Sequence, residues 1–112
     1  MKKVEKSYIT LYKDFSPSPV GRYRSDSQFS GEVFREDYLV PSLKKFDKIT
    51  INLNRLDGIG PSFWDEAFGG IIRCKYYTLD EINKKIIFEC TDDKFLIKYI
   101  KNFMQNANNL LK

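Results

Sequence analysis

A strand, a glycine-rich turn and a helix succeed one another within KITINLNRLDGIGPSFWDEAFGGIIRC, residues 48–74. Apolar and polar residues alternate over 48–56, which predicts a strand with one buried face. The turn at 57–60 holds two glycines, and Pro61 fits the first turn of a helix. Over 62–74 the apolar residues recur at helical spacing: Phe63, Trp64, Ala67, Phe68, Ile71 and Ile72.

Upstream of this unit, β-branched and aromatic residues over 4–12 predict a first strand. A Ser/Pro-rich loop follows over 13–30, and within it Val20 to Arg24 predict a short additional strand. Ser30 is a good N-cap for a helix that continues past Pro41. Because proline lacks a backbone donor, we expect it to kink this helix or to restart it.

Downstream, the sequence Thr78-Leu79-Asp80-Glu81 matches a capping box and predicts a single helical turn. Residues 85–90, KIIFEC, predict another strand. Thr91 or Asp92 is then expected to cap a long helix that occupies 92–112. Its apolar stripe follows a regular rhythm and comprises Phe95, Leu96, Tyr99, Ile100, Phe103, Met104, Ala107, Leu110 and Leu111.

The alternation of strands and helices is typical of an α/β fold whose parallel strands are joined by right-handed crossovers. We predict a small mixed four-stranded sheet with three main helices. A chain of 112 residues leaves room for one domain, which we assign to residues 1–112. Apolar residues make up 42% of the chain and charged residues 30%, which indicates a folded domain and not a disordered segment.

Several classes of protein are excluded by composition or disfavoured by pattern. The chain has no histidine, so Ser-His-Asp and Cys-His catalysis within it is excluded. Cys74 and Cys90 form no CxxC motif, and we expect both to be reduced thiols in the core. The N-terminus lacks a secretory apolar region, and no apolar run approaches the roughly 20 residues that span a bilayer. We therefore expect a cytoplasmic protein without enzymatic activity, cofactor, metal centre or membrane partner.

The charge balance favours weak attraction to phosphates. Nineteen Lys and Arg residues against fifteen Asp and Glu residues give a net charge of +4. Arg22 and Arg24 flank Tyr23 in the Ser/Pro-rich loop, where they could grip a phosphate or stack on a base. In a short edge strand both arginines would instead lie on one solvent-exposed face. One hypothesis is therefore a nucleic-acid-associated accessory protein that uses the basic Arg22–Arg24 loop.

The turn Gly58–Ser62 leads into a helix N-terminus, where free N–H groups can bind a phosphate or a partner carboxylate. The alternative is a tight strand-to-helix turn with Ser62 as an ordinary first-turn residue. The sequence is neither a Walker A loop, nor a dinucleotide fingerprint, nor a nucleophile elbow. Trp64 is either a core residue or an exposed anchor for a partner. Asp65 and Glu66 suit the helix dipole, whereas acid–base chemistry would need one of them buried with a raised pKa.

Two segments, residues 21–43 and 51–73, resemble the STAS-like domain family of unknown function found in small bacterial and mobile-element proteins. The resemblance extends over about residues 20–110. It implies a fold similar to that of the anti-sigma-factor antagonists, a small sheet with helices packed on it. The motifs that carry it are Ser30-Gly31-Glu32, Phe34-Arg35-Glu36, Pro41, and the run from Gly58 to Gly70.

In that broader group, the best-known members are interaction modules that dock onto histidine-kinase-like ATPases, which act as anti-sigma factors. A serine at the start of the helix after the central strand is phosphorylated there, and this switches binding off. The resemblance places Ser62 in that neighbourhood as a candidate phosphorylation site. However, Gly60-Pro61 occupies the positions of the antagonists' Asp-Ser pair, and Ser62 follows one residue later.

The motifs and the resemblance together predict a non-enzymatic, regulatory protein-interaction module. Its partner would be a histidine-kinase-like ATPase or another regulator, bound through the Gly58–Trp64 turn and the adjacent Ser/Pro-rich loop. The end of the last helix, residues 107–111, is expected to extend beyond the sheet and to support a homodimer. The candidate partner-binding residues are Arg22, Arg24, Gly58, Gly60, Ser62 and Trp64.

Overall fold

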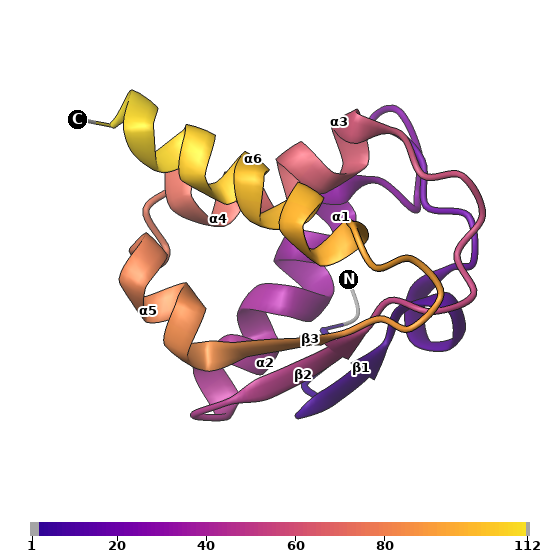
Figure 1. Ribbon diagram of the computed structural model, residues 1–112, viewed down its shortest axis with the longest axis horizontal. Coiled ribbons are helices and arrows are strands. Elements are labelled where there is room, and N and C mark those ends of the chain that lie inside the picture. Colours follow the sequence, from indigo (N-terminus) through magenta and orange to yellow (C-terminus); the bar gives the residue numbers. More distant parts are fainter. Residues whose placement is uncertain (1–2, 112) are drawn as a thin grey trace.

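The computed structural model describes residues 3–111 and has a three-stranded parallel sheet with helices packed on one face (Figure 1). The order of strands in the sheet is the order in the sequence, so the second strand is central and the other two are edges. The sheet consists of β1 (Tyr8–Thr10), β2 (Ile49–Asn52) and β3 (Ile86–Glu89).

The alternation in the sequence decides which side of each strand meets the helices. Ile9, Ile51 and Phe88 form one row across the sheet, and the first two are completely buried beneath the helices. Their neighbours Tyr8 and Ile87 point to the opposite face and are exposed. Period-two burial of this kind is what the alternating pattern of β2 predicted, and that prediction is confirmed.

Two of the helices run without a break but contain a π-helical segment in the middle, and we call each of these continuous helices a coil. These two coils and α6 are the longest helices. The first coil consists of α1 (Gly31–Phe34), η2 (Arg35–Leu39) and α2 (Val40–Lys45). The second consists of α3 (Pro61–Trp64), η3 (Asp65–Gly69) and α4 (Gly70–Arg73). The remaining helical elements are η1 (Leu11–Phe15), α5 (Leu79–Lys85) and α6 (Leu96–Leu110).

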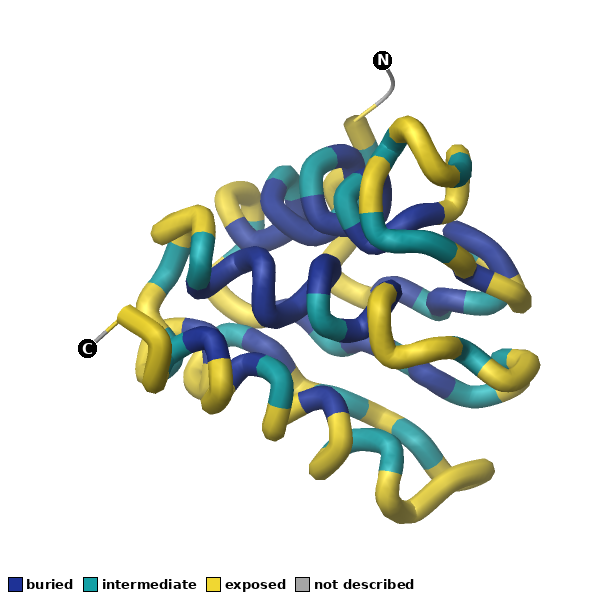
Figure 2. Tube along the Cα trace, turned by 90° about the horizontal axis from the view of Figure 1, so that it is seen from above, coloured by how far each residue is buried: buried dark blue, intermediate teal, exposed yellow. Residues whose placement is uncertain are grey.

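The second coil lies between the first coil and α6 and is the most deeply buried of the three (Figure 2). Its Phe63 and Phe68 rings lie 6.1 and 6.0 Å from the ring of Phe34 in the first coil, between centroids. Gly31 allows this close approach, because a Cβ there would lie 2.7 Å from the carbonyl oxygen of Phe63. The aromatic residues of the central sequence motif therefore form the core between the two coils.

The predicted fourth strand is wrong. Within residues 3–111 the sheet has three strands, all parallel, and Val20 to Arg24 form a loop. The carbonyls of Gly21 and Arg22 accept hydrogen bonds from the N–H groups of Gly31 and Glu32, each at 3.0 Å. The first N–H groups of a helix have no acceptor within the helix. The loop backbone therefore satisfies the start of α1 and does not pair with a strand.

Pro41 explains where α2 begins. In η2 the N–H of Val40 donates to the carbonyl of Arg35, five residues earlier, and Pro41 then occupies the first turn of α2. Pro41 has no N–H for the carbonyl of Asp37, which accepts instead from the N–H of Val4 at 2.8 Å. The two segments form one continuous helix, and the proline coincides with the change from π-helical to α-helical hydrogen bonding. Such π-helical segments are rare and are often found at functional sites.

The last helix begins later than predicted. It starts at Leu96, and neither Thr91 nor Asp92 caps it. The N–H groups of Thr91 and Asp92 both donate to Oδ1 of Asn54, at 2.8 and 3.1 Å. The carboxylate of Asp92 accepts from the N–H of Arg55 at 2.7 Å. These bonds to the loop after β2 hold the segment after β3 outside helical geometry.

The capping box at Thr78 and Glu81 is confirmed, and the helix that it begins, α5, has seven residues and not a single turn.

The expectation of core thiols is wrong, since Cys74 is exposed and Cys90 is half-buried. Residue 112, the end of the predicted C-terminal helix, lies outside the described residues. Across residues 3–111, no helix combines the length and apolar character needed to cross a bilayer.

Candidate functional site

A pocket of about 340 Å³ opens at the end of the sheet where β2 and β3 terminate. Ligands of open α/β sheets bind outside the carboxyl ends of parallel strands. Two loops line this pocket, one from β2 to α3 and one from β3 to α6, and both leave the sheet at the same end (Figure 1). The lining residues are Leu53, Leu56, Gly58, Ile59, Trp64, Cys90, Asp92, Asp93, Phe95, Leu96 and Tyr99.

The predicted glycine-rich turn forms one wall of the pocket. Gly58, Gly60 and Ser62 are exposed, and a Cβ added at either glycine would meet nothing within 4 Å. Trp64 is only 1% exposed, so it belongs to the core while also lining the pocket. The turn therefore lies on the surface, and its tryptophan is not an exposed anchor.

The opposite wall carries two large exposed aromatic side chains. Phe95 is 68% exposed and Tyr99 is 41% exposed. The ammonium of Lys94 lies 5.3 Å from the centroid of the Phe95 ring, and the ring of Tyr99 packs edge-on against Phe103. Exposed apolar side chains that lie together at the edge of a pocket form a candidate interaction surface.

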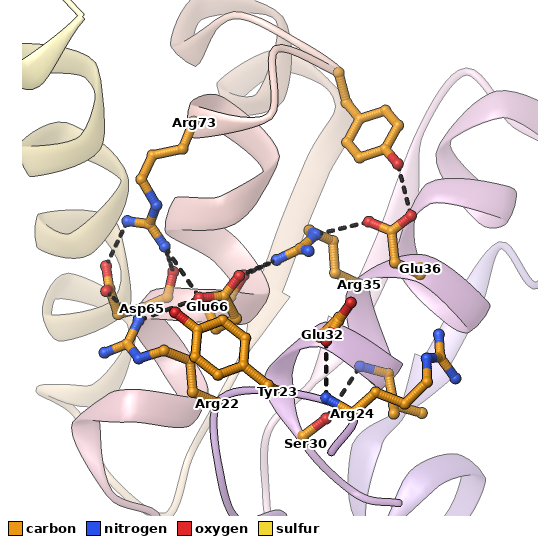
Figure 3. A network of polar contacts seen from close by, with 12 residues as sticks. Arg22, Tyr23, Arg24, Ser30, Glu32, Arg35, Glu36, Asp65, Glu66 and Arg73 are labelled. Carbon is orange, nitrogen blue, oxygen red and sulfur yellow. Dashed lines mark hydrogen bonds and ion pairs between the residues drawn. The ribbon is translucent and has the colours of Figure 1, made fainter. Parts of the chain in front are cut away.

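A second feature, a cluster of charged side chains, lies between the two coils (Figure 3). Arg35 in η2 donates through Nη1 to the carboxylate of Glu66 at 2.7 Å and to the carbonyl of Glu66 at 2.6 Å. Its Nε donates to Glu36 at 2.8 Å. Only 6% of the Arg35 side chain and 11% of the Glu66 side chain are exposed. Gly70 makes room for the Arg35 guanidinium, which a Cβ at position 70 would overlap.

Two further arginines complete this cluster from its edge. Arg22 donates to Asp65 at 2.7 Å and to Glu66 at 3.2 Å, and Arg73 donates to Asp65 at 2.9 Å. Burial alone would raise the pKa of Asp65, but the hydrogen bonds from Arg22 and Arg73 outweigh it and hold that pKa below its usual value. Asp65 is thus kept ionised, the opposite of what a general acid requires.

The same balance applies at the other end of the cluster. Burial would lower the pKa of Arg35, but its hydrogen bonds to Glu36 and Glu66 raise that pKa above its ordinary value. Tyr76 donates to Glu36 at 2.6 Å, and this bond raises the pKa of Tyr76 to about 12. Glu36 has a lowered pKa, because the hydrogen bonds from Tyr76 and Arg35 outweigh its partial burial. We call Arg35, Glu66 and their partners Arg22, Glu36, Asp65, Arg73 and Tyr76 the interhelical clasp.

A sequence profile that describes a STAS-like domain of unknown function matches residues 30–94, more than half of the chain. The chain belongs to this STAS-like family. The match includes both coils, the Gly58–Trp64 turn and the two aspartates of the pocket, and it ends just before Phe95. Comparison with curated proteins and with solved structures gives no significant match.

In this STAS-like domain, two of the predicted site residues, Gly58 and Trp64, line the pocket, whereas Gly60, Ser62, Arg22 and Arg24 do not. Arg22 belongs to the interhelical clasp, and Arg24 donates two hydrogen bonds to the carboxylate of Asp37, each at 3.0 Å. Neither arginine lines the pocket. Both precede the segment that the family profile matches.

Sequence reasoning missed the half of the pocket that follows β3. It assigned Phe95 and Tyr99 to the core stripe of the last helix, because they continue its apolar rhythm. The available signal was the strand order: the residues after two adjacent parallel strands meet at one edge of the sheet. Asp92 and Asp93, which follow the predicted strand 85–90 after Thr91, carried that signal.

Proposed function

We propose that this STAS-like domain is a non-enzymatic interaction module that binds a regulatory protein at the pocket beside the Gly58–Trp64 turn. The observation that carries the proposal is an open apolar pocket at the carboxyl ends of the strands, with Phe95 largely exposed at its edge. Interface hot spots are enriched in aromatic side chains that surround pockets and lose water on binding.

The hydrogen bonds between the two loops support this proposal, because they preform the pocket. Asn54 accepts from two backbone N–H groups of the loop after β3, and Asp92 accepts from Arg55 in return. A preformed site loses less conformational entropy when a partner binds. The pocket therefore suits a partner that docks onto a rigid surface.

Membership of the STAS-like family is consistent with a regulatory role, and the resemblance to anti-sigma-factor antagonists suggests a histidine-kinase-like ATPase as the partner. Ser62 is exposed in the first turn of α3, two residues before the Trp64 that lines the pocket. Phosphorylation there would add negative charge next to the docking surface and alter partner binding. Arg22 and Arg24 both donate to carboxylates, so we do not extend the proposal to nucleic acid.

Site-specific photocrosslinking in the native cell tests this proposal. A photoreactive phenylalanine analogue would replace Phe95 or Ser62 and, as the matched control, Asp47, which is exposed before β2 at the opposite end of the strands. We expect positions 95 and 62 to crosslink to the same protein, and position 47 not to do so. The proposal is wrong if positions 95 and 62 share no crosslinked protein, or if position 47 captures it equally.

A further inference from the structure

The pocket has the opposite charge to the rest of the molecule. The chain carries a net charge of +4, yet the pocket is lined by Asp92 and Asp93 and by no lysine or arginine. Both aspartates are exposed. Any positive group that approached this opening would be attracted to it, although the chain as a whole carries a net positive charge.

Each of these carboxylates has capacity for a further hydrogen bond. Asp92 accepts from the N–H of Arg55 through Oδ2, and Asp93 accepts from the N–H of Phe95 through Oδ1 at 2.9 Å. An ionised carboxylate has about four acceptor positions on its two oxygens. Among the ion pairs of residues 3–111, none includes either aspartate. Neither carboxylate is thus held in an ion pair within the described part of the chain, and the ammonium of Lys94, the neighbouring cation, lies 5.3 Å from the centroid of the Phe95 ring.

The interior of the pocket is apolar. Leu53, Leu56 and Ile59 come from the loop after β2, and Phe95 and Tyr99 face them from the loop after β3 and the start of α6. The volume of about 340 Å³ lies at the small end of the range for ligand sites, roughly 300–1,000 Å³. A site of this size and lining accommodates one large apolar side chain with its neighbours on the rim.

We propose that the partner inserts a large apolar side chain into this pocket and pairs a lysine or arginine next to it in sequence with Asp92 and Asp93. The proposal rests on the proposed function and adds the chemistry of the partner's docking segment. The apolar side chain covers Phe95 and Tyr99, which removes exposed apolar surface from water. The basic residue supplies the charge that the two aspartates lack.

Selection from a displayed library of random linear peptides tests the proposal on the full chain. Peptides enriched on the wild-type protein would be compared on three variants: Phe95→Ser, the double variant Asp92→Asn with Asp93→Asn, and Asp47→Asn. Asparagine keeps the acceptor oxygens that hold Arg55 and Phe95, so the loops retain their hydrogen bonds while both charges are removed. Asp47 is an exposed aspartate before β2 and serves as the matched control.

We expect the enriched peptides to contain a large apolar residue adjacent to Lys or Arg. Their affinity should fall about tenfold or more in the double variant, as expected for the loss of charge-assisted hydrogen bonds. It should also fall with added salt and remain unchanged in Asp47→Asn. Peptides that need Phe95 but bind the double variant as well as the wild type would overturn the basic flank and leave the proposed function standing. If no selected peptide depends on Phe95, both proposals are wrong.

Discussion

The interhelical clasp should contribute a large part of the stability of the domain, and Glu66→Gln tests this. The substitution keeps the shape of the side chain but removes the charge that faces the buried guanidinium of Arg35 at 2.7 Å. Breaking a buried ion pair on one side typically costs about 3–5 kcal/mol. Arg35 still has Glu36 and the carbonyl of residue 66 as acceptors, so the lower end of that range applies.

The partly exposed arginines at the edge of the clasp add little to this free-energy cost. Arg22 and Arg73 also face Glu66, at 3.2 and 3.6 Å, and about a third of each side chain is exposed. Pairs of this kind contribute roughly 0–1 kcal/mol. We therefore expect Glu66→Gln to lower the free energy of unfolding by about 3 kcal/mol.

Urea denaturation measures this change, with the fluorescence of Trp64 as the probe. Trp64 is the single tryptophan of the chain and is buried, so its emission reports unfolding directly. With a urea m value of roughly 1.5 kcal/mol per M, the midpoint should fall by about 2 M. Glu5→Gln, at an exposed glutamate, is the matched control and should leave the midpoint unchanged. A fall below about 0.5 M in Glu66→Gln would refute the argument that the clasp holds an otherwise uncompensated charge.

Four further predictions have defined outcomes. Gly31→Ala places a Cβ 2.7 Å from a backbone carbonyl of the facing coil and should destabilise by about 1–3 kcal/mol in urea denaturation, whereas Gly58→Ala meets open space and should change stability by less than 1 kcal/mol. Glu36→Gln should move the pKa of Tyr76 from about 12 back toward 10, measured as phenolate absorbance against a Tyr76→Phe reference, and an unmoved pKa would contradict this. Because the pKa of Tyr76 is higher in the folded than in the unfolded protein, the stabilisation by this hydrogen bond is present below about pH 10 and is lost between about pH 10 and 12. If the last helix forms a homodimer, Leu110→Ser should lower the sedimentation mass to that of a monomer, and an already monomeric wild type would remove the prediction. If the basic loop binds nucleic acid, affinity should fall steeply with salt, and flat or absent binding at low salt would exclude it.

The local signals in the sequence were sufficient where neighbouring residues decide the structure. The alternating pattern around Ile51, the capping box at Thr78 and the helix after Pro61 each depend on spacing within a few residues, and all three are confirmed. The loop at Val20 to Arg24 depends instead on N–H groups of α1 about ten residues away. Its residue types suit a strand, but the start of the helix needs its carbonyls as acceptors, and this requirement prevails.

In the candidate site, too, some features follow from the local sequence and others from distant contacts. The exposure of the turn at Gly58 follows from its glycines and from the proline after them, which are local features. The start of α6 at Leu96 depends on Asn54, which lies about forty residues earlier and whose side chain binds the backbone after β3. No local propensity at Asp92 distinguishes a helix cap from a residue that is held in a loop by a distant asparagine. The exposure of Phe95 follows from that distant contact.

The second coil connects the pocket to the interhelical clasp, and its geometry keeps their roles separate. Trp64 lines the pocket, whereas Asp65 and Glu66, the next two residues, belong to the clasp. Successive residues of a helix point in different directions, so one short segment can serve both features. The loops of the pocket are joined by Asn54 and Asp92, which take no part in the clasp. Weakening the clasp should therefore lower the stability of the whole domain, while the molecules that remain folded keep a pocket of unchanged shape and charge.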